Sequence, residues 1–280
     1  MSEQPSPPKE REQKIAPINC WAKTTVENTP GISVLNHCVN VGTVAQRLAE
    51  AAGSTLRWKT RPDQIATLAA LHDIGKVSQG FQVKCAAWIL QRGLSARAEK
   101  ERWTACESDH SKVSQYSIGR LLKARGLKAG HAEAWATAIG AHHGAPHGWS
   151  ERGLVPKAGM KEDEWEVMRQ ALALELGRVF GQIDPPTFKP DDARLWAIAG
   201  LISVADWIGS DEKWFSPGCD FPIDESQTQA AKAVGALRMD VRHIATGFGF
   251  HALFDGKFKA NALQQAVLDV AKKPGICRAR

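Results

Sequence analysis

The sequence has no two cysteines at CxxC spacing, although it holds six cysteines in 280 residues. Scattered cysteines in a chain of this length are typical of free thiols in a reducing compartment. The sequence also has no apolar run near the ~18 residues that a membrane span needs, and its N-terminus has no apolar signal core. These absences predict a cytoplasmic protein that has no membrane as a partner.

Regular alternation of apolar and polar residues, the pattern of a half-buried strand, is missing too. Apolar residues instead recur every three or four positions, which is the period of a helix with one face against a core. The expected helices cover about residues 35–52, 65–72, 132–143, 165–179 and 195–208. Segments rich in proline, glycine and aspartate predict loops at 144–162, 182–192 and 211–226. The sequence therefore predicts an all-α fold.

No charge of one sign dominates the composition. The 36 lysines and arginines exceed the 30 aspartates and glutamates by six, and the isoelectric point is about 9.0. This mild excess permits a polyanionic partner without requiring one. Hydrophobic residues make up 43% of the chain, which is enough for a substantial core. Residues 1–15 are rich in proline and charge, and we expect them to form a disordered arm.

Two polar pairs occur where predicted helices end. His72–Asp73 and His142–His143 each follow an apolar helical segment and precede a glycine, Gly75 or Gly144. Glycine commonly ends helices because it adopts the left-handed conformation at little cost. Side chains in a last helical turn can extend beyond the helix end, so both pairs can enter one shared site.

An aspartate also occurs inside an apolar helix. Asp206 lies within the apolar segment 201–208. A buried carboxylate is costly unless it is paired, and a metal cation is a strong partner for it. His37 and His110 lie near the beginnings of two other predicted helices.

Taken singly, each of these histidines is most simply a hydrogen-bonded core residue. His131, His147, His243 and His251 keep that interpretation. The ordered set is different, because five histidines and two aspartates at helix ends or in apolar segments would need a separate structural reason at each position. The residues of this set are His37, His72, Asp73, His110, His142, His143 and Asp206.

The same residues carry a resemblance to a known family. The order H…HD…DH…HHG…ADW resembles the HD-domain metal-dependent phosphohydrolases and, within them, the HD nuclease domain of the CRISPR type I nuclease-helicase. The matching segments are CWAK, LHDIGKVSQGFQ, DHSKVS, GAHHGAPHG and GLISVADWIGSD, which together span about residues 20–215. The resemblance implies an HD-domain helical bundle. One departure is Asn40, where the family often has an aspartate, and we expect this change to affect ligand orientation rather than ligand identity.

The resemblance also divides the chain. It implies an HD nuclease domain over residues 16–245 and a C-terminal extension over 246–280 that is similar to the linker into a helicase domain. These 280 residues contain no G-x-x-x-x-G-K-[ST] loop and no DExH box. We therefore expect the helicase to be absent from this chain, and a standalone nuclease, a truncated gene and an excised domain remain open.

The resemblance implies one or two divalent ions. The ligands it assigns are His37, His72, Asp73 and Asp206 for one ion and His110, His142 and His143 for the other, with Asp73 bridging. Such an imidazole-rich set suits Mn, Fe, Co, Ni or Zn better than Mg, and two ions ~3.5–4 Å apart can activate a water and clamp a phosphate. Asp73 and Lys76 are the expected catalytic residues, since the Lys76 charge can neutralise the phosphate in the transition state. The alternative for Lys76 is an exposed lysine at a helix end. The resemblance also suggests that Ser210 supports Asp206.

The implied activity is that of a hydrolase, a metal-dependent phosphodiesterase that cuts single-stranded DNA in CRISPR antiviral interference. Endonuclease and exonuclease action both remain open. The expected partners are single-stranded DNA, a Cascade-type surveillance complex and a helicase domain or subunit. We expect Trp149 to stack on a base and Arg152 and Lys157 to contact phosphates. Trp207 also lies close to the motifs, although most tryptophans serve the core.

Three rival functions remain. The chain could be an HD phosphohydrolase that acts on nucleotides, such as a deoxynucleotide triphosphohydrolase, and the size of the substrate distinguishes that enzyme from a nuclease. It could be a catalytically decayed fragment that binds DNA or the surveillance complex, although all seven expected ligands are present. A purely structural helical protein would bury many polar groups without partners, which argues against it.

Overall fold

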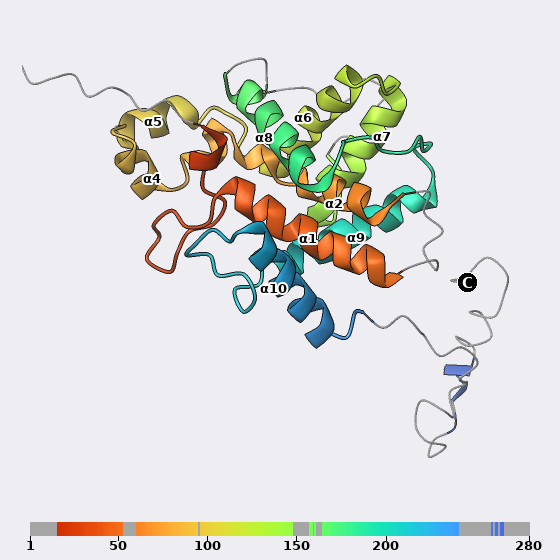
Figure 1. Cartoon of the computed structure of the whole chain (residues 1–280). Helices are drawn as coiled ribbons and strands as arrows, with labels where there is room; N and C mark the ends of the chain where they lie inside the picture. Colours follow the sequence, from red (N-terminus) through yellow and green to blue (C-terminus); the bar gives the residue numbers. More distant parts are fainter. Residues whose placement is uncertain are drawn as a thin grey trace, which may run out of the picture.

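The computed structural model describes residues 16–52, 60–94, 96–147, 157–158, 160, 164–240, 259, 261–262 and 264–265. Within these residues the chain is helical and has no β-strand, which confirms the expected all-α fold (Figure 1). The longer helices are α1 (Val34–Ala52), α2 (Pro62–Ala70), α6 (His110–Ala124), α7 (Ala129–Gly140), α8 (Glu164–Phe180), α9 (Ala193–Gly209) and α10 (Ile223–Ala236). The shorter ones are α3 (Gln79–Gln82), α4 (Ala86–Gln91), α5 (Ala96–Trp103) and the 3-10 helices η1 (Pro17–Asn19), η3 (Ile74–Lys76) and η4 (Ala141–His143). None of the described helices is long and apolar enough to cross a membrane.

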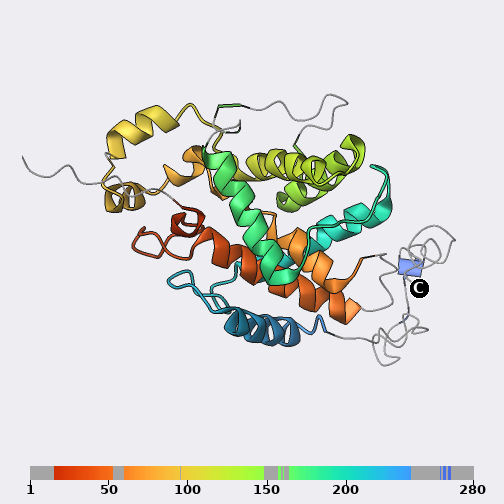
Figure 2. The same cartoon turned by 45° about the horizontal axis from the view of Figure 1, so that its top comes forward.

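Helix α1 forms the centre of the bundle. Helices α2, α8, α9 and α10 all pack against it (Figures 1 and 2). A helix with neighbours on several sides needs buried residues around its circumference, and α1 buries polar residues such as Asn40 and Thr43 together with its apolar ones. His37 in its first turn is only 1% exposed and therefore lies in the core of the bundle.

Helices α6 and α7 form a helical hairpin. The Asp109 carboxylate caps α6, because it accepts hydrogen bonds from the backbone N–H groups of Ser111 at 3.1 Å and Lys112 at 3.3 Å. His110 thus begins a helix, as predicted. The 3-10 helix η3 packs against α6, which brings the segment after α2 close to His110.

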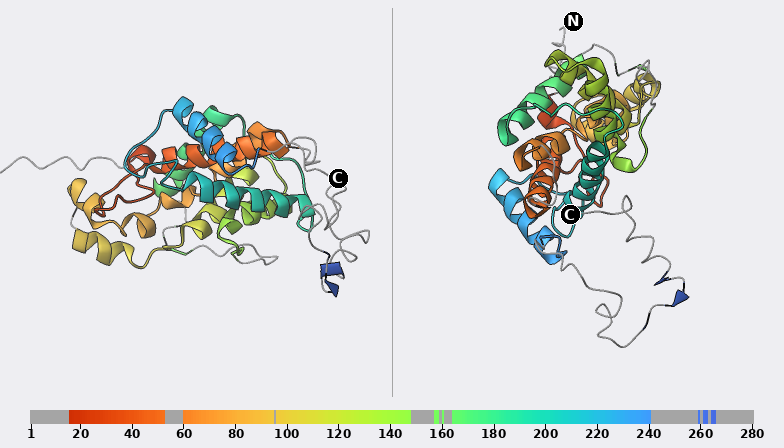
Figure 3. Two further views of the ribbon diagram at one scale, coloured as in Figure 1. Left: turned by 90° about the horizontal axis from the view of Figure 1, so that it is seen from below. Right: turned by 90° about the vertical axis from the view of Figure 1, so that its right-hand side faces the viewer.

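Helix α9 lies between α1 and α7 (Figure 3). Asp192 caps its N-terminus by accepting a hydrogen bond from the Arg194 N–H at 3.0 Å. The apolar residues Ile198, Ile202 and Ala205 are buried. This packing carries Asp206, in the last turn of α9, into the bundle.

Residues 20–33, which we call the N-terminal hook, fold back on themselves before α1. Isolated bridges pair Trp21 with Ser33 and Thr24 with Pro30. The hook contacts the loop after α9, where the Ile32 N–H donates to the Pro217 carbonyl at 2.7 Å. Figures 1 and 2 show these two segments, dark red and teal, side by side. No periodic pattern in the sequence predicted the hook.

The predicted loops are partly confirmed. The loop at 182–192 is confirmed, but the loop expected over 211–226 is too long, because α10 begins at Ile223. Two acidic residues in the first turn of α10 suit the positive end of the helix dipole. None of the described cysteines forms a disulfide. Outside the described residues lie the arm 1–15, Cys277, most of 144–162 and almost all of 246–280.

Candidate metal centre

The helix that leads to His72 and Asp73 ends earlier than predicted. Helix α2 stops at Ala70, and the two residues lie in a turn before η3. Gly75 is not in the left-handed conformation, so the predicted helix stop at this glycine is wrong. Gly75 serves close packing instead, because a Cβ there would lie 2.0 Å from the His110 carbonyl oxygen. The missing side chain lets Asp73 approach the start of α6.

The second polar pair is placed as predicted. Helix η4 extends α7, and Gly144 follows in the left-handed conformation with a φ of 96°. The Gly144 N–H donates to the Ala141 carbonyl at 2.7 Å, which ends the helical segment. His142 is buried and His143 is exposed, so the pair has one side chain in the core and one at the surface.

Four of the predicted ligands lie together in a cluster that we call the buried set: His37, His72, Asp73 and Asp206. One ligand atom from each lies within 4.8 Å of the others. Nε2 of His37 is 2.9 Å from Oδ2 of Asp73, and Nε2 of His72 is 3.4 Å from Oδ1 of Asp206. All four residues are at most 8% exposed. Helix α1, the turn after α2 and helix α9 therefore meet at one point.

The other three predicted ligands form what we call the open set: His110, His142 and His143. Their ring nitrogens also lie within 4.8 Å of one another. Nε2 of His110 is 3.0 Å from Nε2 of His143. His143 is exposed and His110 is half-buried, so solvent reaches this set more easily than the buried set.

Asp73 lies between the two sets. Its Oδ2 faces the buried set, 2.9 Å from Nε2 of His37 and 3.2 Å from Nε2 of His72. Its Oδ1 faces the open set, 3.2 Å from Nε2 of His110 and 3.4 Å from Nε2 of His142. One carboxylate thus presents one oxygen to each set, which is the arrangement that a bridging ligand requires.

Two of the histidines are oriented by the backbone. Nδ1 of His72 lies 2.9 Å from the Ala69 carbonyl oxygen, and Nδ1 of His142 lies 3.0 Å from that of Ile139. Donation by Nδ1 turns Nε2 toward the centre as a potential metal ligand. Among the residues that the structure describes, Nε2 of His72, Nε2 of His142 and Oδ1 of Asp73 are buried and have no hydrogen-bond partner. Such atoms are rare, and a divalent cation is a partner that all three can share, so these residues fit a metal ion.

The carboxylates of the buried set are strongly acidic. Burial alone would raise the pKa of Asp73, but His72 and Lys76 hold that pKa well below its usual range. Burial alone would lower the pKa of His72, but the Asp73 and Asp206 carboxylates raise it to about 10. The ionised carboxylates therefore favour a positive charge at Nε2 of His72, either a proton or a metal cation.

Lys76 lies inside the site, so its alternative interpretation as an exposed surface lysine is wrong. Its Nζ is 2.7 Å from Oδ2 of Asp73, and its side chain is 10% exposed. The Nζ also lies 5.6 Å from the centre of the Phe81 ring. Phe81 contacts His110 edge-on, with ring centres 5.3 Å apart. The Lys76 ammonium group therefore adjoins the shared carboxylate.

Asp206 is held by a neighbour on its own helix. The Ser210 hydroxyl donates to Oδ1 of Asp206 at 3.0 Å, as the resemblance suggested. A further contact was missed by the sequence analysis, because Nζ of Lys23 donates to the Ser210 carbonyl oxygen at 2.5 Å. Burial and the nearby Lys76 charge lower the pKa of Lys23. The only signal for Lys23 was its presence in the matching segment CWAK.

The other described histidines have structural hydrogen bonds. Nδ1 of His131 lies 2.6 Å from the Phe188 carbonyl oxygen, and Nε2 of His147 lies 2.5 Å from the Ser111 hydroxyl. These contacts agree with the structural interpretation of both residues. Outside the described residues lie His243 and His251.

Among the residues expected to contact DNA, the structure describes Lys157. Its Nζ is 3.5 Å from Oε2 of Glu107, and its side chain is 64% exposed. Trp149 and Arg152 lie outside the described residues, so these DNA contacts stay a prediction. Trp207 in α9 is 69% exposed, unlike the core tryptophans.

Asn40, the departure from the family pattern, contacts α10. Its Oδ1 accepts a hydrogen bond from the Ser226 hydroxyl at 2.7 Å, and its side chain is buried. Its Nδ2 has no hydrogen-bond partner in the described part of the chain. The expected effect of Asn40 on ligand orientation stays a prediction.

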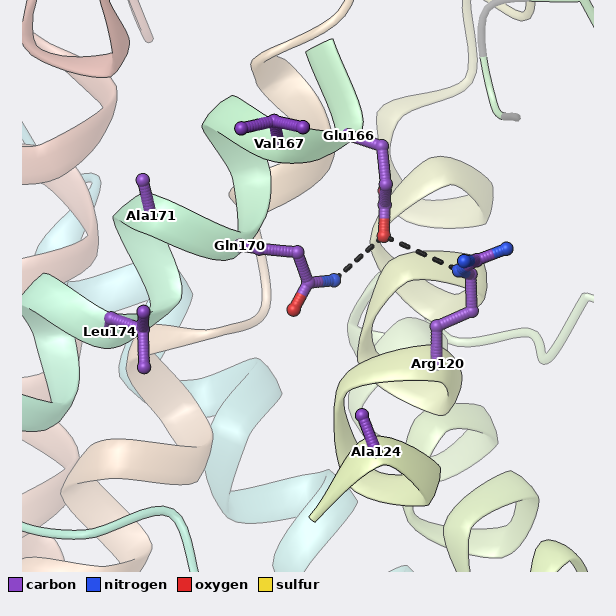
Figure 4. A pocket seen from close by; sticks show the side chains of 7 residues that line it. All are labelled: Arg120, Ala124, Glu166, Val167, Gln170, Ala171 and Leu174. Atoms are coloured by element: carbon purple, nitrogen blue, oxygen red, sulfur yellow. Dashed lines mark hydrogen bonds and ion pairs between the residues drawn. The ribbon is translucent and has the colours of Figure 1, made fainter. Parts of the chain in front are cut away.

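A separate pocket of about 720 Å³ lies between α6 and α8 (Figure 4). It is lined by Arg120, Ala124, Glu166, Val167, Gln170, Ala171 and Leu174. Glu166 accepts a hydrogen bond from Nε2 of Gln170 at 2.7 Å and lies 3.7 Å from Nε of Arg120. Its polar groups contact one another, and none of the seven predicted ligands lines it. The candidate metal centre is therefore a better candidate for the functional site than this pocket.

The fold and the clustered histidines and aspartates define an HD-domain protein with a candidate metal centre. The sequence matches the family described as Cas3, HD domain, over residues 21–215, which is more than half of the chain. The chain therefore belongs to the Cas3 HD-domain family, a family of CRISPR-associated HD nucleases.

Individual relatives agree with this membership. The CRISPR-associated endonuclease/helicase Cas3 of Thermus thermophilus is 33% identical over an alignment of 215 residues, and the match covers 72% of this chain and 23% of the relative. This chain thus spans less than a quarter of that relative's length. The structure of the Thermus thermophilus Cas3 HD domain in the presence of Ni²⁺ matches with a TM-score of 0.54 and 26% identity, covering 79% of this chain and 90% of that one. T. fusca Cas3 matches with a TM-score of 0.55 and 20% identity, covering 91% and 30% of the two chains. These likenesses confirm the HD-domain helical bundle.

Proposed function

We propose that this chain is a metal-dependent phosphodiesterase that cleaves single-stranded DNA in CRISPR type I antiviral interference. The observation that carries the proposal is the position of Asp73, whose two carboxylate oxygens face two separate groups of imidazoles. Membership of the Cas3 HD-domain family supports it.

In this proposal both sets bind divalent ions. The ligands are His37, His72, Asp73 and Asp206 for one ion and His110, His142 and His143 for the other, with Asp73 shared. Bound ions supply Lewis-acid chemistry, lowering the pKa of a water and polarising a phosphate. The imidazole-rich ligands favour Mn, Fe, Co, Ni or Zn over Mg. The structure of the Thermus thermophilus HD domain in the presence of Ni²⁺ supports a transition metal.

Asp73 and Lys76 are the proposed catalytic residues. Asp73 contributes one oxygen to each set, and the Lys76 ammonium group, whose Nζ is 2.7 Å from Oδ2 of Asp73, would donate to a phosphate oxygen in the transition state. The ammonium groups of Lys76 and Lys23 balance the carboxylates of Asp73 and Asp206. With neutral imidazoles, each divalent ion then adds two positive charges, so the loaded centre attracts an anion such as a phosphodiester.

Single-stranded DNA suits the surroundings of this centre. Trp207 follows a ligand directly in sequence and exposes its ring, on which a base can stack. Lys157, Arg152 and Trp149 are proposed as further DNA contacts. We also propose a Cascade-type surveillance complex and a helicase domain or subunit as partners. The name endonuclease/helicase of the Thermus relative supports the helicase.

The proposed domain plan follows the expected one. We propose that residues 16–245 form the HD nuclease domain and that residues 246–280 are an extension similar to the linker into a helicase domain, while the arm over residues 1–15 stays a prediction from the sequence. The proposed location is the cytoplasm, where such a nuclease meets its DNA.

The test is degradation of circular single-stranded DNA by metal-stripped protein. Mn²⁺, Co²⁺, Ni²⁺ and Mg²⁺ are added singly to wild type, to Asp73→Ala and to a control at an exposed aspartate, Asp191→Ala. We expect cutting with the transition metals that is lost in Asp73→Ala and kept in Asp191→Ala. A circle also tests for endonuclease action, and linear DNA run in parallel detects an exonuclease.

Two results would contradict the proposal. Folded protein that leaves circular and linear DNA intact with every metal is not a nuclease. If it hydrolyses deoxynucleoside triphosphates instead, the nucleotide phosphohydrolase is the better assignment. If it binds DNA without cutting anything, the decayed fragment is the better assignment.

A further inference from the structure

The N-terminal hook is tied to the segment that carries Asp73. Gln82, in α3, is fully buried and connects the two. Its Oε1 accepts a hydrogen bond from the Trp21 N–H at 3.2 Å, and its Nε2 donates to the Trp21 carbonyl at 2.9 Å. The same Nε2 donates to the Lys76 carbonyl at 2.9 Å. The hook is thus fixed to η3, directly after Asp73.

The hook is also tied to the segment that carries Asp206. Nζ of Lys23 donates to the carbonyl oxygen of Ser210, the C-terminal cap of α9, at 2.5 Å. A cation at this end of a helix is favoured by the helix dipole. The Ser210 hydroxyl in turn donates to Oδ1 of Asp206 at 3.0 Å. One residue therefore links Lys23 to a predicted metal ligand.

The hook itself is well braced. The Lys23 carbonyl accepts a hydrogen bond from the Gly31 N–H at 2.9 Å, across the hook. Gly31 packs so closely on the loop after α9 that a Cβ there would lie 2.0 Å from the Pro217 carbonyl oxygen. The Ser33 hydroxyl donates to Oδ2 of Asp220 in the same loop at 2.7 Å. These contacts hold the backbone of the hook in place, so the position from which Lys23 contacts Ser210 is fixed.

We propose that Lys23 is a positioning residue for the buried set. Through Ser210 it fixes Asp206 relative to Asp73, and so it sets the affinity of the buried set for its ion. The inference rests on the proposed metal centre and gives Lys23 a positioning role beyond the charge balance proposed above. Residues that orient metal ligands typically change metal affinity about 10- to 100-fold when they are substituted.

The test is a titration of metal-stripped protein with Co²⁺ alone, in which the absorption spectrum of the bound ion reports binding. Lys23→Met is compared with wild type and with Lys232→Met, a control at an exposed lysine of α10. The two variants are also titrated in a His143→Ala background. There, Co²⁺ binding to the buried set is measured while the open set lacks one of its ligands. We expect Lys23→Met to weaken the buried-set site about 10-fold or more and to leave the open-set site unchanged.

Two further variants separate positioning from packing. Lys23→Arg keeps a donor and a positive charge, so it should restore most of the Co²⁺ affinity. Ser210→Ala breaks the same connection one step further on and should cause a similar loss. Because both substitutions act through one connection, the double variant Lys23→Met/Ser210→Ala should lose little more than either alone.

Each contrary outcome has a distinct meaning. Equal Co²⁺ affinity in wild type and Lys23→Met overturns the inference, and a raised KM for DNA in the same variant would assign Lys23 to substrate phosphate instead. Weakening of both sites together with a lower melting temperature, without rescue by Lys23→Arg, overturns it in favour of a general folding role. A wild type that binds no ion at all overturns the proposed metal centre itself.

Discussion

The two halves of the candidate metal centre, the buried set and the open set, are built differently. The buried set has two carboxylates, and its residues are at most 8% exposed. The open set has three imidazoles and no carboxylate of its own, and His143 is at the surface. The halves share Asp73, which presents one oxygen to each.

Because of this difference, we expect the two sets to differ in their affinity for a metal ion and in their access to substrate. Carboxylates that solvent cannot screen attract a cation strongly, so the buried set is suited to holding an ion tightly. Neutral imidazoles near solvent hold an ion less tightly but leave room for a substrate to reach it. The comparison predicts that substitutions will differ in effect according to the half that they disturb.

The largest effect should come from the residue that the halves share. Asp73→Asn removes the negative charge that both sets use and nearly preserves side-chain volume. Loss of one electrostatic contact commonly costs 10²–10³-fold in rate, so we expect a loss of about 1,000-fold or more in DNA cleavage. Single-turnover cleavage with Mn²⁺ measures it, and bound metal measured in parallel should fall at both sites. Retention of either site at full affinity would show that Asp73 does not bridge.

The next largest effect should be on the free energy of unfolding, which substitutions in the two sets should lower by different amounts. In metal-free protein, His72→Ala leaves Asp73 and Asp206 buried with one positive partner fewer, and we expect a loss of about 3 kcal/mol. His143→Ala removes an exposed ring and should cost less than about 0.5 kcal/mol. Urea unfolding with a chelator present measures both changes. Equal losses would mean that burial does not separate the two sets.

A substitution between the halves should have a smaller effect on stability. A Cβ at Gly75 would lie 2.0 Å from the His110 carbonyl oxygen and 2.5 Å from the Ser114 nitrogen, and neither backbone atom can move alone. We expect Gly75→Ala to cost about 2 kcal/mol, as overpacking does. It should also weaken the open set by moving His110 away from Asp73, which a Co²⁺ titration measures.

Gly126→Ala is the matched control for this substitution. Gly126 has a φ of +91° and open space around it, so an alanine there costs backbone strain of about 1 kcal/mol without reaching the metal centre. Metal affinity should therefore stay unchanged in Gly126→Ala. A similar loss of metal affinity in both variants would contradict the role assigned to Gly75.

The sequence was sufficient to predict most of the longer helices, though not α10, and the clustering of the seven residues. Helical periodicity is local, and charged or imidazole side chains in apolar helices stand out without knowledge of the fold. The end of α2 at Ala70 was not predictable in this way, because the position of Gly75 is decided by its contact with the backbone of α6. Tertiary packing here replaced the local signal that glycine usually provides.

The N-terminal hook shows the same limit. Lys23 lies 187 residues from Ser210 in the sequence, and nothing in its local pattern indicates that contact. The hook has no helical period, since its conformation depends on isolated bridges and on Gln82. Residues that would bind a metal can be recognised by type, whereas residues that position them are defined by contacts between distant segments.

The smallest predicted effect is the difference in affinity between the two sets in the intact protein. The buried set combines two carboxylates with two imidazoles, and the open set borrows only one oxygen of Asp73. We expect the buried set to bind Co²⁺ about 10-fold more tightly, which is about 1.4 kcal/mol. Graded chelation of the fully loaded protein should therefore release one ion before the other. The ion that is released first should be the one that His143→Ala removes. If both ions leave together, the shared carboxylate couples the sets so strongly that they act as one site, and the contrast in burial has no consequence for affinity.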